Sequence, residues 1–99
     1  MASNARAHIE EIVAADAEIQ AEYETLRLRR AIVSQLRALR EQQSWTQQQL
    51  ADAVGVPRSA IARLESAVHS PRLETLHAVA RALGYDVDVR LKRRRVPVA

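Results

Sequence analysis

The first quarter of the chain combines apolar and acidic residues with the period of an α-helix. Apolar side chains recur at intervals of three, four and seven residues, and carboxylates fill most positions between them. The apolar positions are Ile9, Ile12, Val13, Ile19, Tyr23 and Leu26. This spacing predicts an amphipathic helix of about 18 to 20 residues. A second apolar stripe, from Ile32 to Leu39, follows without a stop signal, so residues 7–42 form either one helix or two with a kink near residues 25–28.

From Ser44 onward the pattern predicts short helices with well-marked ends. Thr46 is a suitable N-cap, and Gln49, three residues later, completes a capping box ahead of the next apolar residues. Gly55 ends this helix, because glycine adopts the left-handed backbone conformation at the lowest cost.

Two further helices follow in the same style. Pro57 suits the first turn of a helix that directs Ile61 and Leu64 inward. Ser70-Pro71 precedes another helix, which Gly84 closes.

After Gly84 the apolar period changes from that of a helix to that of a strand. Four apolar residues alternate with charged ones over Tyr85, Asp86, Val87, Asp88, Val89, Arg90, Leu91 and Lys92. This alternation predicts a short half-buried β-strand. The sequence predicts no second strand elsewhere, and a single strand cannot satisfy its own backbone hydrogen bonds. We therefore expect two copies to pair their strands about a two-fold axis, forming a homodimer. Lys92–Arg95 and residues 96–99 follow as a basic tail, which is either simply solvated or reaches toward DNA.

Composition narrows the classes of protein that remain. The chain is 47% hydrophobic but only 3% aromatic, which favours a helical core over a sandwich or barrel. There is no cysteine, which excludes disulfides, zinc ribbons and thiol catalysis. No apolar run approaches the roughly 20 residues of a membrane span, and the acidic N-terminal segment is unlike a signal peptide. We therefore expect a cytoplasmic protein, associated with the nucleoid when bound to DNA, that makes no membrane contact.

Charge is segregated along the chain. Residues 1–26 hold six acidic residues and one basic residue, a net charge of −5, whereas residues 27–99 hold 14 basic and six acidic residues, a net charge of +8. This asymmetry indicates a polyanion as the partner of the larger part and a basic partner for the N-terminal arm. The alternative is a solvated acidic helix beside an ordinary basic domain.

Residues 46–66 have the layout of a helix-turn-helix unit, in which two short helices are joined by a tight turn. The apolar residues expected in its core are Leu50, Val54, Val56, Ile61 and Leu64. Ala51 is small where the two helices would cross. With these residues inside, the outward stripe of the second helix consists of Arg58, Ser59, Ala62, Arg63 and Ser66. A helix N-terminus favours phosphate, and arginines can donate two hydrogen bonds to guanine.

Residues 36–84 resemble the XRE/Cro/CI family of lambda-repressor-like helix-turn-helix domains. Six residues fall at the spacing of the family: Gln47, Ala51, Gly55, Ile61, Leu64 and Glu65. The resemblance implies an all-α, five-helix domain, here with an N-terminal helical extension and a short C-terminal β-strand. We accordingly divide the chain into an acidic helical arm (1–30), a helix-turn-helix domain (31–84), and a dimerising strand with a basic tail (85–99).

The resemblance also assigns roles to individual residues. It implies that Gln47 binds a backbone phosphate and that three residues read base edges, namely Arg58, Ser59 and Arg63. It further implies an ion pair between Arg40 and Glu65. Separately, we expect His69 and Arg72, in the loop before the last helix, to contribute contacts to the DNA backbone.

Three residues depart from the family pattern. Family members usually carry glycine where Ala67 stands and often where Ser44 stands, so two turns use costlier residues. Pro57 replaces the more usual serine or threonine N-cap, which removes one side-chain cap.

With its acidic extension and alternating C-terminal segment, the chain is most similar to HigA-type antitoxins, which bind DNA and partner RNase toxins of the RelE superfamily. The resemblance implies a homodimeric repressor of double-stranded operator DNA that also neutralises a HigB-like toxin. We expect Glu11, Glu18 and Glu22 to face that basic toxin. One alternative is a stand-alone or phage-type regulator without a toxin. Another is a protein-interaction module with vestigial DNA binding, in which Arg58→Ala with Arg63→Ala leaves operator affinity unchanged.

Nothing in the sequence points to catalysis. The three histidines, His8, His69 and His77, share no metal-ligand spacing, and no nucleophile motif or phosphate-binding loop is present. We expect neither an enzyme nor a bound cofactor or metal.

Overall fold

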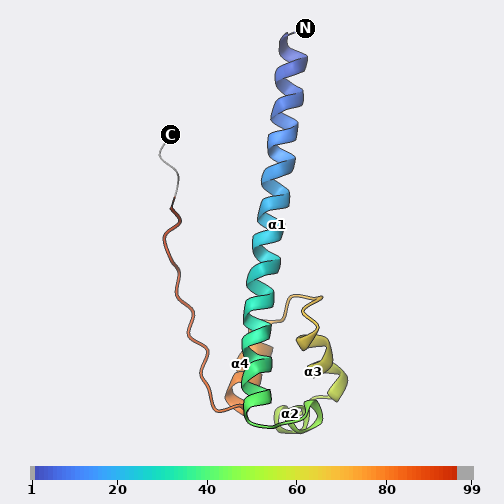
Figure 1. Ribbon diagram of the computed structural model, residues 1–99, viewed down its shortest axis with the longest axis vertical. Helices are drawn as coiled ribbons and strands as arrows, with labels where there is room; N and C mark the ends of the chain where they lie inside the picture. Colours follow the sequence, from blue (N-terminus) through green and yellow to red (C-terminus); the bar gives the residue numbers. More distant parts are fainter. Residues whose placement is uncertain (1, 96–99) are drawn as a thin grey trace.

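The computed structural model describes residues 2–95 and consists of four helices (Figure 1). These are α1 (Ala2–Gln42), α2 (Gln47–Val54), α3 (Arg58–Glu65) and α4 (Leu73–Ala82). The molecule is elongated, with dimensions of 64 × 28 × 20 Å and a radius of gyration of 19.4 Å. A compact domain of this length would have a radius of gyration of about 13 Å. Residue 1 and residues 96–99, the end of the expected tail, lie outside the described residues.

Residues 7–42 form one helix rather than two. No glycine or proline interrupts α1, and Thr25, at the suspected kink, donates its hydroxyl to the carbonyl of Ala21 at 3.0 Å. At about 1.5 Å per residue, a helix of 41 residues accounts for the long dimension of the molecule. No helix in the described part of the chain is both long and apolar enough to span a membrane.

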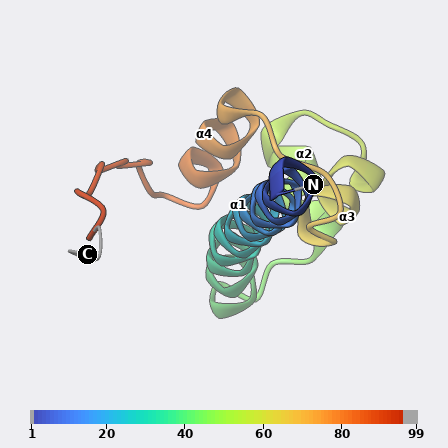
Figure 2. The ribbon, with the colours of Figure 1, turned by 90° about the horizontal axis from the view of Figure 1, so that it is seen from above.

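The core lies at the C-terminal end of α1, where α2, α3 and α4 pack around it (Figures 1 and 2). It is formed by Val33, Leu36, Leu50, Ala51, Ile61, Leu64, Leu76, Val79, Ala80 and Leu83. The predicted burial of Leu50, Ile61 and Leu64 is confirmed, whereas Val54 and Val56 are only half-buried at its edge. We call this four-helix unit the body.

The N-terminal part of α1 projects beyond the body, and we call it the arm, residues 2–28 (Figure 1). Every described side chain from residue 5 to residue 25 is exposed. This includes the apolar stripe predicted from the sequence, in which Ile9 is 60% exposed, Ile19 64% and Tyr23 62%. Within a single chain, therefore, nothing covers this stripe from Ile9 to Tyr23, while Leu26, its last member, is half-buried.

The structure corrects two expectations about the C-terminal region. The part of the chain that is described contains four helices instead of five, and residues 85–95 form no strand. The segment is extended but unpaired, and its apolar residues are exposed: Val87 by 37%, Val89 by 70% and Leu91 by 97%. A strand needs a neighbour to bond its backbone groups, and one chain supplies none here. The alternating valines, in turn, disfavour a fifth helix.

Candidate nucleic-acid interface

The capping box predicted for α2 is confirmed. The hydroxyl of Thr46 accepts a hydrogen bond from the backbone N–H of Gln49 at 3.0 Å, and the Gln49 side chain accepts one from the Thr46 N–H at 2.8 Å. Gly55 ends the helix in the left-handed conformation, with a φ of 84°. Ala51 is fully buried, as expected for a small residue where two helices cross.

The two turns that use other residues in place of glycine also adopt positive φ angles. Ser44 has a φ of 58° and Ala67 a φ of 56°. L-residues with a β-carbon occupy this region at a cost of about 1 to 2 kcal/mol. The two positions at which the family usually carries glycine are therefore positions of backbone strain in this chain.

The helix α3 lies at the periphery of the body (Figure 2), and its exposed side chains are mostly polar. Ile61 and Leu64 are buried, while Arg58, Ser59, Arg63 and Ser66 are exposed; Ala62 is half-buried, so it contributes less to the outward stripe than expected. Pro57 stands at the N-cap without a side-chain hydrogen bond, which agrees with the predicted loss of a cap. The exposed arginines are thus held on a short helix whose other side is fixed in the core.

Gln47, on α2, bridges the start and the end of α3. Its Oε1 accepts a hydrogen bond from Nη1 of Arg58 at 3.0 Å, and its Nε2 donates to Oε1 of Glu65 at 3.4 Å. Gln47 is half-buried and Arg58 is exposed, so the pair lies at the edge of the body. This link between a phosphate-binding candidate and a base-reading candidate was not foreseen from the sequence.

The ion pair between Arg40 and Glu65 anchors the C-terminal end of α3 to α1. Nε and Nη2 of Arg40 each donate to one carboxylate oxygen of Glu65 at 2.8 Å, and Nη1 donates to the carbonyl of Trp45 at 2.6 Å. The two side chains are only 10% and 5% exposed. The hydrogen bond to the Glu65 carboxylate raises the pKa of Arg40 further, against a smaller opposing effect of burial. The guanidinium therefore stays charged, and its geometry is that of a bidentate pair.

Two arginines that the sequence analysis missed extend these contacts. Arg37 donates to Glu41 at 3.0 Å and lies 3.9 Å from Glu65. Arg29 donates to the carbonyl of Val68 at 3.1 Å and to the hydroxyl of Ser70 at 2.7 Å, which ties α1 to the loop between α3 and α4. The spacing of Arg37 and Glu41 is a recognisable helical ion-pair signal, whereas the Arg29 contacts bridge about 40 residues and leave no local signature.

Arg72 and His69 are exposed residues of the loop that leads into α4, with Arg72 at the N-cap position. In the described structure neither side chain shares a hydrogen bond with Gln47 or with α3. The structure thus brings Gln47, Arg58, Glu65 and Arg40 together and leaves Arg72 as a separate basic position.

The carboxylates expected to face a basic partner lie on the arm. Glu11, Glu18 and Glu22 are all exposed. They are spaced by seven and four residues and so share one side of α1. We call these three residues the acidic line.

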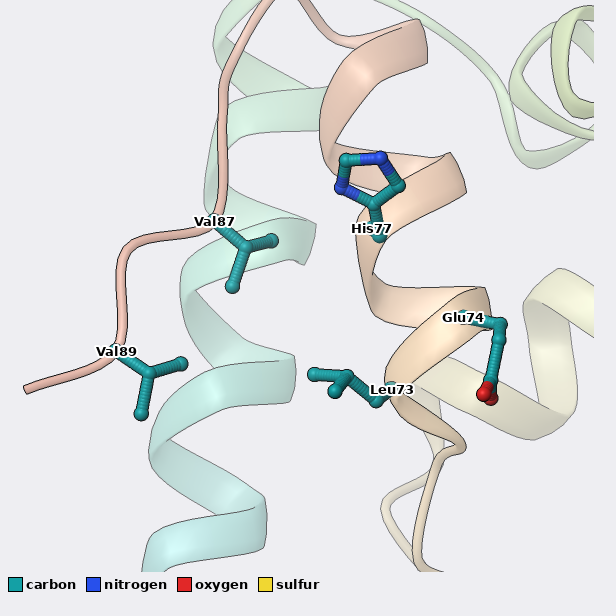
Figure 3. Close-up of a pocket in the computed structure, with 5 residues that line it drawn as sticks. All are labelled: Leu73, Glu74, His77, Val87 and Val89. Carbon is teal, nitrogen blue, oxygen red and sulfur yellow. The ribbon is translucent and has the colours of Figure 1, made fainter.

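Away from α3, an open groove of about 400 Å³ lies between α4 and the extended C-terminal segment (Figure 3). Leu73, Val87 and Val89 point toward one another across it, and His77 and Glu74 complete its lining. The exposed arginines of α3, Arg58 and Arg63, do not line this groove.

Throughout residues 2–95 no three histidine or carboxylate side chains are close enough together to hold a metal ion.

Two short helices in a shared core, a glycine turn between them, and arginines exposed along the second helix define a DNA-binding protein of the helix-turn-helix class. The comparison with known families agrees with this class. The helix-turn-helix family model matches residues 36–89, more than half of the 99 residues, and the chain belongs to this family.

A curated relative supports the same placement. The chain is 45% identical over 49 residues to a protein of Methanothermobacter thermautotrophicus named as an uncharacterized HTH-type transcriptional regulator. The alignment covers 50% of this chain and 71% of that protein. No solved structure matches the chain significantly. These findings place the chain among the helix-turn-helix transcriptional regulators, of the XRE type.

Proposed function

We propose that the protein is a homodimeric, sequence-specific repressor that reads palindromic duplex DNA with α3. In this proposal Arg58, Ser59 and Arg63 contact base edges in the major groove, while Gln47 and Arg72 contact the phosphate backbone. The observation that carries the proposal is that both arginines of α3 are exposed while Ile61 and Leu64, on its other side, are buried in the core.

The Gln47–Arg58 contact supports these roles. A hydrogen bond of 3.0 Å to Gln47 restricts the rotamers of the Arg58 side chain before DNA arrives. A side chain that is already ordered loses less conformational entropy on binding. Gln47 also lies at the first position of α2, whose N-terminus favours a phosphate.

Selection from a library of random duplexes tests the DNA-binding proposal directly, because the operator is unknown. We expect the selected duplexes to share a palindrome whose half-sites are about 34 Å apart, one turn of DNA. Selected sequences without any common motif would contradict sequence-specific binding.

We further propose that the arm makes this repressor a HigA-like antitoxin of a basic RNase toxin of the RelE superfamily. The support is the net charge of −5 on residues 1–26 and the full exposure of the acidic line, Glu11, Glu18 and Glu22. An RNase needs a cationic site to hold RNA phosphates, and a projecting acidic helix presents the complementary field. The competing proposal is a stand-alone or phage-type regulator, in which the arm has no toxin partner.

A neutralisation assay separates these two proposals. We expect the full chain to co-purify with a RelE-like protein encoded next to it and to relieve that protein's toxicity. A chain lacking residues 1–26 should lose this protection while keeping a folded body. Full protection by the shortened chain would exclude the arm as the toxin-binding element.

On this proposal the protein acts by binding alone, in the cytoplasm and on the nucleoid, and needs neither a cofactor nor a metal. Because the acidic line and α3 are different surfaces, one molecule could hold the toxin and the operator together. Operator affinity that does not respond to saturating toxin would argue against regulation by such a complex.

A further inference from the structure

Four consecutive cations, Lys92–Arg95, form a concentration of charge that the proposed function does not use. We call them the basic run. Every side chain of the basic run is exposed, and no ion pair among the described residues involves any of them. A short charge run can simply be solvated, so its location in the fold has to decide what it binds.

The C-terminal segment follows α4 before the basic run begins. Figure 3 shows Val87 level with His77, and Val89 level with Leu73, the first residue of α4. All four residues line the same groove. The segment therefore runs from the C-terminal end of α4 back toward its N-terminal end, as its rising course in Figure 1 also shows.

This course brings the basic run to the end of the body that carries Arg72. Arg72 is the N-cap residue of α4 and is exposed, and the proposed function assigns it a contact with the DNA backbone. Between the groove and the basic run, Arg90 is paired with Asp88 at 3.1 Å, so uncompensated positive charge begins at Lys92. The basic run thus continues outward from the end of the body at which Arg72 lies.

Hydrogen bonds to the body do not fix the direction of the segment beyond Tyr85. In the described part of the chain, the last backbone bond to the body runs from the N–H of Tyr85 to the carbonyl of Ala80, and the Arg90–Asp88 bond lies within the segment itself. Residues 86–95 in extended conformation span up to about 35 Å. The basic run can therefore reach a backbone that lies well outside the surface of the body.

We propose that the basic run binds the phosphate backbone of duplex DNA that flanks the bases read by α3, and so extends the contact made by Arg72. Duplex DNA carries about one negative charge per 1.7 Å of its axis, which an extended row of cations can follow. Three of the four cations are arginines, whose planar guanidinium groups bind phosphate with two hydrogen bonds. Figure 2 shows α3 and the C-terminal segment on opposite sides of α1, so the basic run meets the backbone outside the bases that α3 contacts. The inference rests on the proposed binding of duplex DNA and does not depend on a toxin.

The salt dependence of DNA binding tests this contact. In the double variant Arg93→Gln/Arg94→Gln, the slope of log affinity against log salt concentration should become shallower by about 1 to 2, since each phosphate contact contributes about 0.9. Affinity at 0.1 M salt should then fall about 10- to 100-fold. The matched control is Arg6→Gln/Arg81→Gln, which also removes two exposed cations, one from the arm and one from the last turn of α4. It should change the slope by less than about 0.5.

Duplex length tests the flanking position. The wild-type chain should bind its selected palindrome at least about threefold more tightly when about one turn of DNA is added at each end. The Arg93→Gln/Arg94→Gln variant should not distinguish the two lengths. Circular dichroism should find the same helix content in this variant and in the wild-type chain, because residues 93 and 94 lie outside the four helices.

A scrambled duplex separates this inference from the proposed function. Phosphate contacts carry no sequence information, so Arg93→Gln/Arg94→Gln should keep the wild-type preference for the palindrome, whereas Arg58→Ala/Arg63→Ala should lose it. The shallower slope of Arg93→Gln/Arg94→Gln should also appear on the scrambled duplex, so it can be measured even if α3 reads no sequence.

Two results would overturn the proposal. One is a slope that Arg93→Gln/Arg94→Gln leaves unchanged, or that the control variant changes equally. The other is a loss of dimer mass at unchanged slope, which would assign the basic run to the acidic arm of a second copy instead of DNA.

Discussion

Arg40 and Glu65 form a bidentate ion pair within the body, and both side chains are nearly removed from solvent. Arg40→Ala would leave the Glu65 carboxylate buried without its bidentate partner. We expect it to lower the free energy of unfolding by about 3 kcal/mol, measured by urea denaturation. Arg37→Ala is the control, because the exposed Arg37–Glu41 pair should contribute less than about 1 kcal/mol. Equal losses in the two variants would contradict this ranking.

Ala67 carries backbone strain that glycine would release. Its φ of 56° lies in the left-handed region. We expect Ala67→Gly to stabilise the protein by about 0.5 to 1 kcal/mol, because relief of strain exceeds the added entropy of the unfolded chain. Ala60→Gly, in the regular backbone of α3, should instead destabilise it by about 1 kcal/mol. Thermal unfolding of both variants measures the two signs, and a destabilised Ala67→Gly chain would refute the strain.

Some features of the candidate site could be predicted from the sequence at the level of single residues, and others could not. The exposure of Arg58 and Arg63 follows from helical periodicity once Ile61 and Leu64 are assigned to the core. The pairing of Arg40 with Glu65 came from family resemblance, since a contact across 25 residues has no local signature. The bond between Gln47 and Arg58 was not predicted at all, because it depends on how α2 and α3 cross.

Among the elements, those with local start and stop signals were predictable. The capping box and Gly55 fixed the ends of α2 within the chain itself. Whether α1 continued through residues 25–28 was undecided, because neither a stop signal nor a partner for the arm is visible in the sequence. The strand predicted from the alternating C-terminal segment was wrong for residues 85–95, since alternation permits a strand but pairing requires a neighbouring backbone.

The unpaired C-terminal segment gives a prediction about stability. Its apolar residues are exposed, and within the described residues Tyr85 makes the last backbone bond to the body, donating its N–H to the carbonyl of Ala80 at 2.8 Å. We expect a chain that ends after Tyr85 to keep its free energy of unfolding within about 0.5 kcal/mol, by urea denaturation, since the removed residues lie outside the core. A loss of several kcal/mol of unfolding free energy, or a shift from dimer to monomer, would contradict this prediction and support pairing of the C-terminal segment between two copies.

In the whole molecule, one continuous helix joins two regions of opposite charge. The arm is acidic and carries an uncovered apolar stripe, while the body is basic and presents α3. Because α1 enters the core through Val33 and Leu36 and holds α3 through Arg40, a partner bound to the arm would be connected directly to the helix-turn-helix unit. This arrangement suits the proposed function, in which the arm and α3 bind different partners.

The most direct measurement is the affinity of the full chain for its selected duplex, compared with that of the Arg58→Ala/Arg63→Ala double variant. If α3 reads DNA, each arginine contributes about 1 to 3 kcal/mol, so the double variant should bind at least about 30-fold more weakly. Arg81→Ala, which removes an exposed arginine from α4, is the matched control and should change affinity less than about threefold. A double variant that binds within a few-fold of the wild-type chain would contradict DNA recognition by α3.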